Sequence, residues 1–496
     1  MNAQAPQLSL TVPSRAAHGT AVAGAAGAGL LLGVLGGNPE LGLAAVLVVV
    51  GGIVAIARQD LVSAFVVFVV YSNAAVVAVN SQGMPGIVVV AVVLLLAIPL
   101  AQQFRSGTPL VVDELLFLLL GLLLATGVSA LLARDTALGM DKFQTLAIEG
   151  VLIYFLVVNV LRSPAALRLV LWSVIGAGVF LAMVTIVQYL TKTFDRPWLG
   201  FAALDPAYLS GKTTEPRAGG PVADPNYYAQ LLLPALGFAL VAALRGRRTA
   251  LRLAAAASAA TIVFALVLTS SRGGALALVA MLALLVALRT VRPLQLVALI
   301  TAVCLALVLS PSYVERLQTT TTSGITAQSG TTVAADSAQR ARLTENLAAW
   351  NVFADHPVFG VGPGSFPLYY QEYAARIGIE IHQRVRSGQD AGKPPEREAH
   401  NIVLGLAADL GVVGLGLFLL IVGVAFAGLL RARRSWLRAG RPDLADIASA
   451  LVVGLAAYLA AGAFLSLAFE RYLWLLLAIA GATIGLARRM AADAPR

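Results

Sequence analysis

The feature that most constrains the fold is the apolar stretch between Arg252 and Arg289, which contains one charged residue, Arg272. A helix needs about 20 residues to cross the hydrocarbon core of a membrane, so this stretch is too long for a single crossing. It therefore predicts two spans that reverse direction near Gly273 and Gly274. The reversal would leave Arg272 at a membrane surface, beside a tight turn.

Similar apolar runs recur along the chain, in which 59% of the residues are hydrophobic and 12% are charged. The mean hydropathy of +0.84 lies far outside the range of soluble globular proteins. We predict an all-α polytopic membrane protein, a bundle of about 12–14 transmembrane helices with a long structured loop on its outer face. Cys304 lies within an apolar run and is expected to be a small buried hydrophobic residue.

The predicted spans lie near residues 21–37, 41–57, 61–79, 84–101, 111–133, 144–161, 166–190, 226–244, 253–270, 273–289, 293–310, 401–430, 447–468 and 472–487. No persuasive cleavage site closes the first run, so we expect it to be retained. The spans and loops divide the chain into N-terminal transmembrane helices (1–190), an outer loop (191–225), transmembrane helices with the reversal at Arg272 (226–310), a large outer loop (311–400) and C-terminal transmembrane helices (401–496).

The distribution of arginines predicts the orientation in the bilayer. With both termini in the cytoplasm, the groups Arg245–Arg252 and Arg431–Arg441 fall on the cytoplasmic side, as the positive-inside rule requires. This accounts for much of the net charge of +10 without a nucleic-acid partner. The loops 191–225 and 311–400 both fall on the outer face, where we expect the active site.

The large outer loop has a pattern of its own. Residues 319–334 form a Thr/Ser/Gly tract with few large apolar groups, which predicts a mobile segment. Asp336 and Gln339 resemble a capping box, and apolar residues then recur at helical spacing until His356-Pro357. We therefore expect a surface helix from Asp336 to about His356.

A second helix is expected after the glycine-rich segment 359–364. No Gly-Lys-Ser/Thr follows these glycines, so they predict a turn rather than a phosphate-binding loop. Four aromatic residues then mark one helical face: Phe366, Tyr369, Tyr370 and Tyr373. This face could lie in the lipid headgroup layer or pack against the rest of the protein.

Two arginines are candidates for binding an anion on the outer face. An arginine near the membrane costs about 2.5 kcal/mol or more without a partner, so Arg272 marks an anion site unless it only sets topology. Arg217 lies in a flexible segment before Asn226 and could turn inward, or remain a solvated loop residue.

His400 is the candidate base. With Asn401 it opens a long apolar helix, and a place in the first helical turn would favour the neutral imidazole. Glu396 or Glu398 could orient the ring, although a carboxylate would raise the pKa of the histidine. An ordinary interfacial histidine is the alternative.

The outer loops offer no Asp-x-Asp sequence and no His/Asp cluster at ligand spacing, which disfavours metal-dependent transfer. We predict no metal site and no cofactor. Guanidinium groups would then have to stabilise a leaving diphosphate, which Arg217 and Arg272 could bind while His400 deprotonates a hydroxyl.

Several short motifs occur in a recognisable order between about residues 210 and 425. They are Arg217 before Asn226, Ser271-Arg272-Gly273 at a span end, His356-Pro357-Val358-Phe359-Gly360-Val361-Gly362-Pro363-Gly364-Ser365-Phe366 in the large outer loop, and His400-Asn401 followed by Gly411 to Gly416. Together they resemble the O-antigen ligase and O-antigen polymerase superfamily of bacterial envelope glycosyltransferases.

The resemblance implies a metal-independent, inverting enzyme with a GT-C-type fold in the bacterial cytoplasmic (inner) membrane. Its donor would be a glycan on undecaprenyl diphosphate, held by Arg217 and Arg272, and its acceptor a lipid such as lipid A core or another glycan. His400 would activate the acceptor hydroxyl, with Asn401, Glu398 and Ser271 as supporting residues. Two extra spans and the Thr-rich loop depart from the usual ligase, so polymerase activity stays open; a lipid or polysaccharide transporter is the alternative of another class.

Overall fold

The computed structural model describes residues 59–204, 216–308, 332–377, 397–465 and 468–493. These residues form helices joined by turns, with no strand among them. The described helices are α3 (Gln59–Tyr71), α4 (Ala74–Gln82), α5 (Ile87–Leu94), α6 (Ala97–Arg105), α7 (Glu114–Leu132), α8 (Thr136–Thr145), the π-helix η1 (Leu146–Leu152), α9 (Ile153–Val160), α10 (Pro164–Thr191), the short 3-10 helices η2 (Trp198–Gly200) and η4 (Gly220–Val222), α11 (Pro225–Arg245), α12 (Thr249–Leu268), α13 (Arg272–Ala287), α14 (Pro293–Val308), α16 (Thr332–Asp355), α17 (Phe366–Ile377), α18 (Ile402–Arg438), α19 (Pro442–Gly462) and α20 (Arg471–Ala492).

Within the described ranges, nine helices are long and apolar enough to cross a membrane, or ten if the bent pair α3–α4 is one span. The all-α polytopic fold class is confirmed. Every predicted span from 61–79 onward coincides with helical residues, whereas 21–37 and 41–57 lie outside the described residues.

Several predicted spans differ in form from simple crossing helices. The span 61–79 is bent by 51° between α3 and α4, where Asn73 has a left-handed backbone with φ of 62°. The spans 273–289 and 293–310 correspond to α13 and α14, which have 16 residues each. Straight helices of that length fall short of the usual hydrocarbon thickness of about 30 Å.

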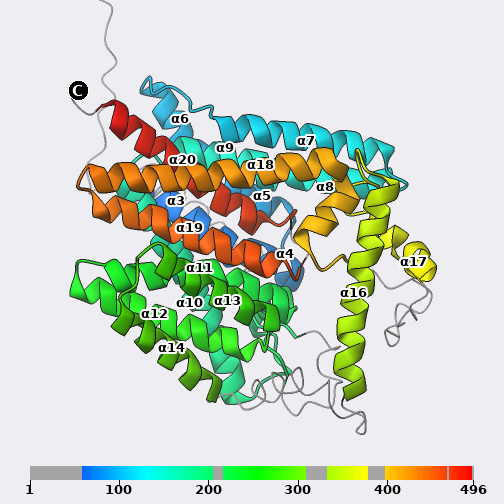
Figure 1. Ribbon diagram of the computed structural model, residues 1–496. Helices are drawn as coiled ribbons and strands as arrows, with labels where there is room; N and C mark the ends of the chain where they lie inside the picture. The colour runs from blue at the N-terminus through cyan, green and yellow to red at the C-terminus, as the bar shows by residue number, and fades with distance from the viewer. Residues whose placement is uncertain (1–58, 205–215, 309–331, 378–396, 466–467, 494–496) are drawn as a thin grey trace, which may run out of the picture.

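The spans run alongside one another, with α11 and α19 in contact at the centre of the bundle (Figure 1). Both central helices are 78% buried in their apolar windows. Asp224 begins α11 by accepting hydrogen bonds from the backbone N–H groups of Asn226 (2.7 Å) and Tyr227 (2.8 Å), with Pro225 in the first helical position. The start of α11 is thereby fixed at one end of the bundle.

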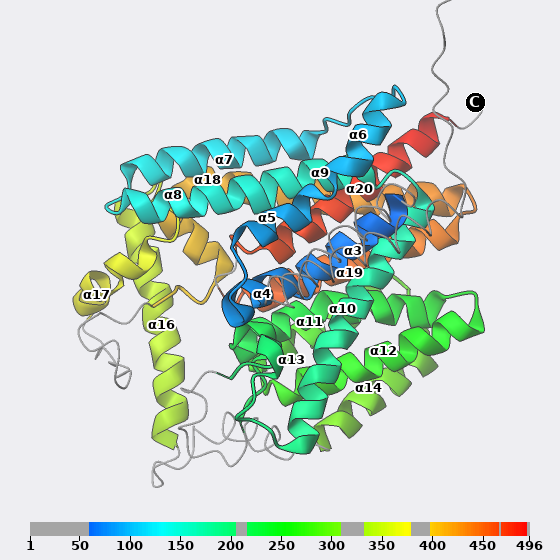
Figure 2. The same cartoon turned by 180° about the vertical axis from the view of Figure 1, so that it is seen from behind.

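Helix α16 lies crosswise over that same end, with α17 beside it (Figures 1 and 2). We call this the α16 end. Residues predicted to be cytoplasmic meet at the opposite end, where Arg168 pairs with Asp443 (2.6 Å) and Arg245 lies 3.4 Å from Asp446. The predicted burial of Cys304 is wrong: the residue is exposed on α14, which is a peripheral helix of the described bundle (Figure 1).

The two helices of the large loop were predicted with one error. The surface helix already includes Thr332, so its predicted start at Asp336 is wrong, while its end at Asp355 confirms the predicted stop before His356-Pro357. Most of the Thr/Ser/Gly tract lies outside the described residues. The aromatic face of α17 packs against α16, for Phe366 is 2% and Tyr373 4% exposed in a cluster with Ala348, Ala349 and Val352. Of the two alternatives for this face, packing against protein is therefore correct.

Candidate active site

Helix α18 follows His400 and Asn401, and it is interrupted rather than continuous. It breaks at Gly411, which has φ of 64° and ψ of −164°. The turn after α16 lies against this break: the N–H of Val361 donates to the carbonyl of Ala408 (3.0 Å), and the N–H of Val412 donates to the carbonyl of Pro357 (2.8 Å). Residues 402–410 therefore form a separate short helical segment, held in place by the large loop.

Two glycines permit this close approach. Gly360 and Gly411 both have positive φ, and a Cβ atom on Gly360 would clash with the backbone of Asp409, as one on Gly411 would with Val358. The carboxylate of Asp409 accepts hydrogen bonds from the backbone N–H groups of Gly364 (2.9 Å) and Phe366 (3.0 Å). The glycine-rich segment is thus a turn, and Asp409 fixes the start of α17.

His400 lies one residue before the helix cap rather than within the first turn. Asn401 is the cap, and its Oδ1 accepts from the N–H groups of Val403 (2.9 Å) and Leu404 (3.1 Å). His400 itself has φ of 43°, a left-handed conformation that is uncommon outside glycine.

The ring of His400 contacts a carboxylate that lies far from it in the sequence, on α16. Nδ1 lies 3.0 Å from Oε2 of Glu345 on α16 and 3.0 Å from the carbonyl oxygen of Glu398. Glu345 is 1% exposed, and its Oε1 also accepts a hydrogen bond from Arg397 (2.9 Å). Of the two candidates for orienting the ring, Glu398 contacts Nδ1 through its backbone carbonyl. The other candidate, Glu396, lies outside the described residues.

One sequence signal could have identified Glu345. It shares a helical face with Ala348, Ala349 and Val352, all fully buried. A carboxylate on the apolar face of a surface helix is costly unless it is paired, so it requires a cation from elsewhere in the chain. The position of Glu345 on this apolar face therefore predicts that its carboxylate has a cationic partner, but does not predict which residue that partner is.

The pairing changes the acidity of the histidine. Burial alone lowers the pKa of His400, but the hydrogen bond and charge of Glu345, with the carbonyl of Glu398, raise it by more, against the opposing charge of Arg342. The net result is a pKa above the ordinary value of 6.5. Because Nδ1 faces Glu345, Nε2 is the ring nitrogen that can exchange a proton with another molecule.

Arg217 donates hydrogen bonds to carbonyl and amide oxygens of neighbouring segments. Its Nε donates to the carbonyl of Thr269 (2.9 Å), and its Nη2 lies 3.1 Å from Oδ1 of Asn226 and 3.4 Å from the carbonyl of Ser270. The guanidinium group therefore lies against the reversal between α12 and α13. These contacts fix its plane.

Arg272 begins α13 and is half-buried. Ser271 caps this helix by accepting from the N–H of Gly274 (3.2 Å), and its Oγ donates to Oδ1 of Asn226 (3.0 Å). Asn226 thus contacts both Arg217 and the residue before Arg272. The two candidate arginines are parts of one hydrogen-bonded unit.

The end of α19 connects the arginines with the histidine segment. A Cβ atom on Gly273 would lie 3.2 Å from Cβ of Phe464, and one on Gly462 would lie 3.3 Å from Cγ2 of Ile402. Residues 462–464 therefore touch both the reversal at Arg272 and the start of α18. Arg217, Arg272 and His400 lie at the same end of the bundle.

Glu398 provides a second connection. Burial raises the pKa of its carboxyl group. The charges of His400 and Lys142 lower this pKa, whereas those of Glu470 and Asp224 raise it further. Glu398 therefore lies within electrostatic reach of both His400 and the cap of α11. Glu470 in turn accepts a hydrogen bond from Tyr227.

Among the described residues, no group of three His, Cys, Asp or Glu side chains is placed to hold a metal ion. Among the charged groups at the α16 end are two arginines and a histidine beside a buried glutamate. This geometry can bind an anion next to a group that accepts a proton.

Fold and site together define a polytopic helical membrane protein with a polar centre at one end of its bundle. The family model described as O-Antigen ligase (Wzy_C) matches residues 257–419, from within α12 to within α18. Over these residues the chain is similar to that family, which supports the resemblance to the O-antigen ligase superfamily that the sequence motifs predicted. The matched region contains Arg272, Glu345 and His400, while Arg217 precedes it. A search of curated proteins gives no match.

Proposed function

We propose that this protein transfers a glycan from a polyprenyl diphosphate to a hydroxyl group of an envelope acceptor, without a metal ion. The observation that carries the proposal is the pairing of His400 with buried Glu345 at the same end of the bundle as Arg217 and Arg272. The family match supports an enzyme of the ligase or polymerase type. The identity of the donor rests on the chemistry of the arginines.

The arginines bind the diphosphate. A guanidinium group matches the geometry of phosphate oxygens and keeps its charge at any physiological pH. The hydrogen bonds of Arg217 to Thr269 and Asn226 hold its plane, so little freedom is lost when a phosphate binds. Ser271 supports the site by linking α13 to the same asparagine.

The histidine takes the proton of the acceptor. Nε2 of His400 accepts it as the hydroxyl oxygen attacks the anomeric carbon, and the bond between that carbon and the diphosphate oxygen breaks. The electron pair leaves with the diphosphate, whose added charge Arg217 and Arg272 stabilise. Direct attack inverts the configuration at the anomeric carbon.

Glu345 and the cap residue position the base. The carboxylate of Glu345 holds Nδ1 and stabilises the imidazolium that forms, as an orienting carboxylate does in catalytic triads. Asn401 fixes the start of α18, and the carbonyl of Glu398 completes the contacts of Nδ1. These residues act through His400.

We place the enzyme in the bacterial cytoplasmic membrane with both termini in the cytoplasm and the α16 end on the outer face. The orientation follows from the arginines at the opposite end, including Arg168 and Arg245. A ligase acting on lipid A core and a polymerase extending a glycan use the same chemistry. The acceptor decides between them.

The test is transfer by the purified protein in detergent, with a glycan on undecaprenyl diphosphate as donor. Lipid A core and a free glycan chain are offered as separate acceptors. Product with the first supports a ligase, and product with the second supports a polymerase. A transporter makes no product in detergent, so the absence of any transfer would overturn the proposal.

A further inference from the structure

Lys142 is a charged residue at the α16 end to which the proposed mechanism gives no role. It lies in the last turn of α8 and is half-buried. Its Cγ and Cε atoms each lie 3.1 Å from the place that a Cβ atom on Gly364 would occupy. The aliphatic part of the lysine side chain therefore packs against the glycine-rich turn, which restricts where its ammonium group can lie.

The helices around Lys142 are connected to the helical segment that follows His400. Helix α8 packs against α7, and Oγ of Ser129 on α7 lies 2.9 Å from the carbonyl oxygen of Asp409. The carboxylate of Asp409 accepts a hydrogen bond from the N–H of Gly364 (2.9 Å), the residue against which Lys142 packs. Lys142 and His400 are therefore held by the same set of packed and hydrogen-bonded elements.

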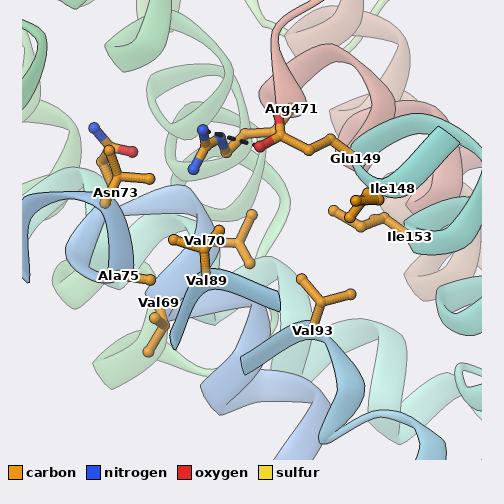
Figure 3. Close-up of a pocket in the computed structure, with 11 residues that line it drawn as sticks. Val69, Val70, Asn73, Ala75, Val89, Val93, Ile148, Glu149, Ile153 and Arg471 are labelled. Atoms are coloured by element: carbon orange, nitrogen blue, oxygen red, sulfur yellow. Dashed lines mark ion pairs between the residues drawn. The ribbon is translucent and has the colours of Figure 1, made fainter. Parts of the chain in front are cut away.

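In the described part of the chain, the ammonium group of Lys142 has neither an ion pair nor a hydrogen bond. Its charge acts from a greater distance on the carboxyl groups of Glu398, Glu149 and Asp409. The last two have partners of their own: Oε1 of Glu149 lies 3.0 Å from Nη2 of Arg471 (Figure 3), and Asp409 accepts two backbone hydrogen bonds. Neither requires Lys142 as its counter-ion, so this half-buried ammonium group favours an anion supplied by another molecule.

The position of Lys142 favours the acceptor over the donor as the source of this anion. In the proposed mechanism the diphosphate lies at Arg217 and Arg272, and the attacking hydroxyl lies between the anomeric carbon and Nε2 of His400. The rest of the acceptor then extends on the histidine side, away from the arginines. Glu398 lies on this side, since its carbonyl contacts Nδ1 of His400, and its exposed side chain is within electrostatic reach of Lys142.

We propose that Lys142 binds an anionic substituent of the acceptor glycan, a phosphate monoester or a carboxylate, close to the hydroxyl that attacks the donor. The inference rests on the proposed function and adds a residue that determines acceptor specificity. The ammonium group donates charge-assisted hydrogen bonds to the anion, and the carboxylate of Glu398 accepts hydrogen bonds from sugar hydroxyl groups beside it. Lys142 contacts the substrate and takes no part in proton transfer.

The first test compares acceptors built on one short glycan: the neutral parent, its phosphate monoester and its hexuronic acid form. We expect Lys142→Gln to raise KM for an anionic acceptor by about tenfold with little change in kcat, because a charge-assisted hydrogen bond is lost. KM for the neutral acceptor should stay within about twofold, which also shows that the variant is folded. A response to one anion alone identifies the substituent as phosphate or carboxylate. Equal changes for all the acceptors, or no change for any, would overturn the proposal.

Arg134→Gln is the matched control, because Arg134 is a cation in the turn between α7 and α8 that has partners of its own. Its guanidinium carbon lies 4.3 Å from the ring centre of Tyr369, and its Nη2 lies 3.8 Å from Glu372. The ratio of KM for anionic and neutral acceptors should stay within about twofold of the wild-type ratio. The same shift in this ratio for Arg134→Gln as for Lys142→Gln would make the preference a general effect of positive charge at the α16 end and would overturn the assignment to Lys142.

Acceptor binding without turnover separates this inference from the proposed function. Isothermal titration of the wild type and Lys142→Gln with each acceptor, in the absence of donor, gives the Kd values. We expect about tenfold weaker binding of an anionic acceptor to the variant. If this difference is present and the wild type transfers no glycan, the proposed function is wrong while the anion site stands. If transfer depends on Arg272 and His400 but neither Kd nor KM responds to Lys142→Gln, the enzyme stands and the assignment of Lys142 is wrong.

Discussion

The arginine side and the histidine side of the site hold their charged groups in opposite ways. Arg217 contacts neutral acceptors, the carbonyls of Thr269 and Ser270 and the amide of Asn226. His400 lies instead beside the buried carboxylate of Glu345. Carbonyl and amide oxygens orient a guanidinium group, whereas a carboxylate makes an imidazole more basic. One arrangement suits anion binding, and the other suits proton transfer.

The largest expected effect is on the arginine side. Arg272→Ala should abolish transfer, because the leaving diphosphate loses a guanidinium group. Arg272→Lys should also be inactive, because lysine keeps the charge but lacks the planar pair of donors. Transfer by the purified variants is the measurement, and Arg289→Ala, beyond the other end of α13, is the control. An active lysine variant would reduce Arg272 to a point charge, and a fully active alanine variant would remove the diphosphate assignment.

The next effect separates binding from chemistry. His400→Ala should bind the lipid-linked donor as the wild type does, yet lose about 10² or more in single-turnover rate, the usual contribution of a general base. His356→Ala, an exposed histidine whose ring packs on Tyr369, is the matched control and should keep its rate. Normal turnover of His400→Ala would make His400 a structural residue and move the search for the base to other groups.

The spans were predictable because hydropathy is a local property. Every described helix that crosses the bundle lies where an apolar run was found, and the alternation of spans brought Arg217, Arg272 and His400 to one end. The break at Gly411 was not predictable, because it depends on a hydrogen bond to the carbonyl of Pro357 and one from the N–H of Val361, both far earlier in the chain. Local sequence carries no signal for such contacts.

The partner of His400 illustrates the same limit. Nearby Glu396 and Glu398 were the natural candidates by sequence, yet the carboxylate that reaches the ring comes from α16. Chain proximity misled because the left-handed backbone at His400 and the crosswise placement of α16 set the direction of the ring. The sequence predicted the base candidate, while its orienting group required the tertiary structure.

Glu345→Gln should have a moderate effect with a distinctive pH dependence. The amide can still accept the hydrogen bond from Nδ1, so we expect transfer to fall only by about tenfold. Because Glu345 raises the pKa of His400, wild-type activity should fall as the pH drops through a value above 6.5. In the variant this acid limb should move to lower pH. The measurement is a pH profile of single-turnover rates, and the control is Glu372→Gln, at an exposed residue of α17. An unshifted acid limb would assign Glu345 to folding alone.

The smallest expected effect is that of a chelator. It tests whether the arginines and His400 are sufficient for transfer without a metal ion. The arginines supply the positive charge that a metal would otherwise bring to the diphosphate, and His400 supplies the base. Transfer by the purified protein should therefore stay within about twofold of its rate after excess EDTA. The same treatment of Arg272→Ala should reveal no residual metal-dependent activity. Loss of wild-type transfer with EDTA, restored by magnesium or manganese, would contradict this prediction. It would mean that the arginine side binds its anion together with a metal cation, so that the contrast between the two sides would not rest on protein groups alone.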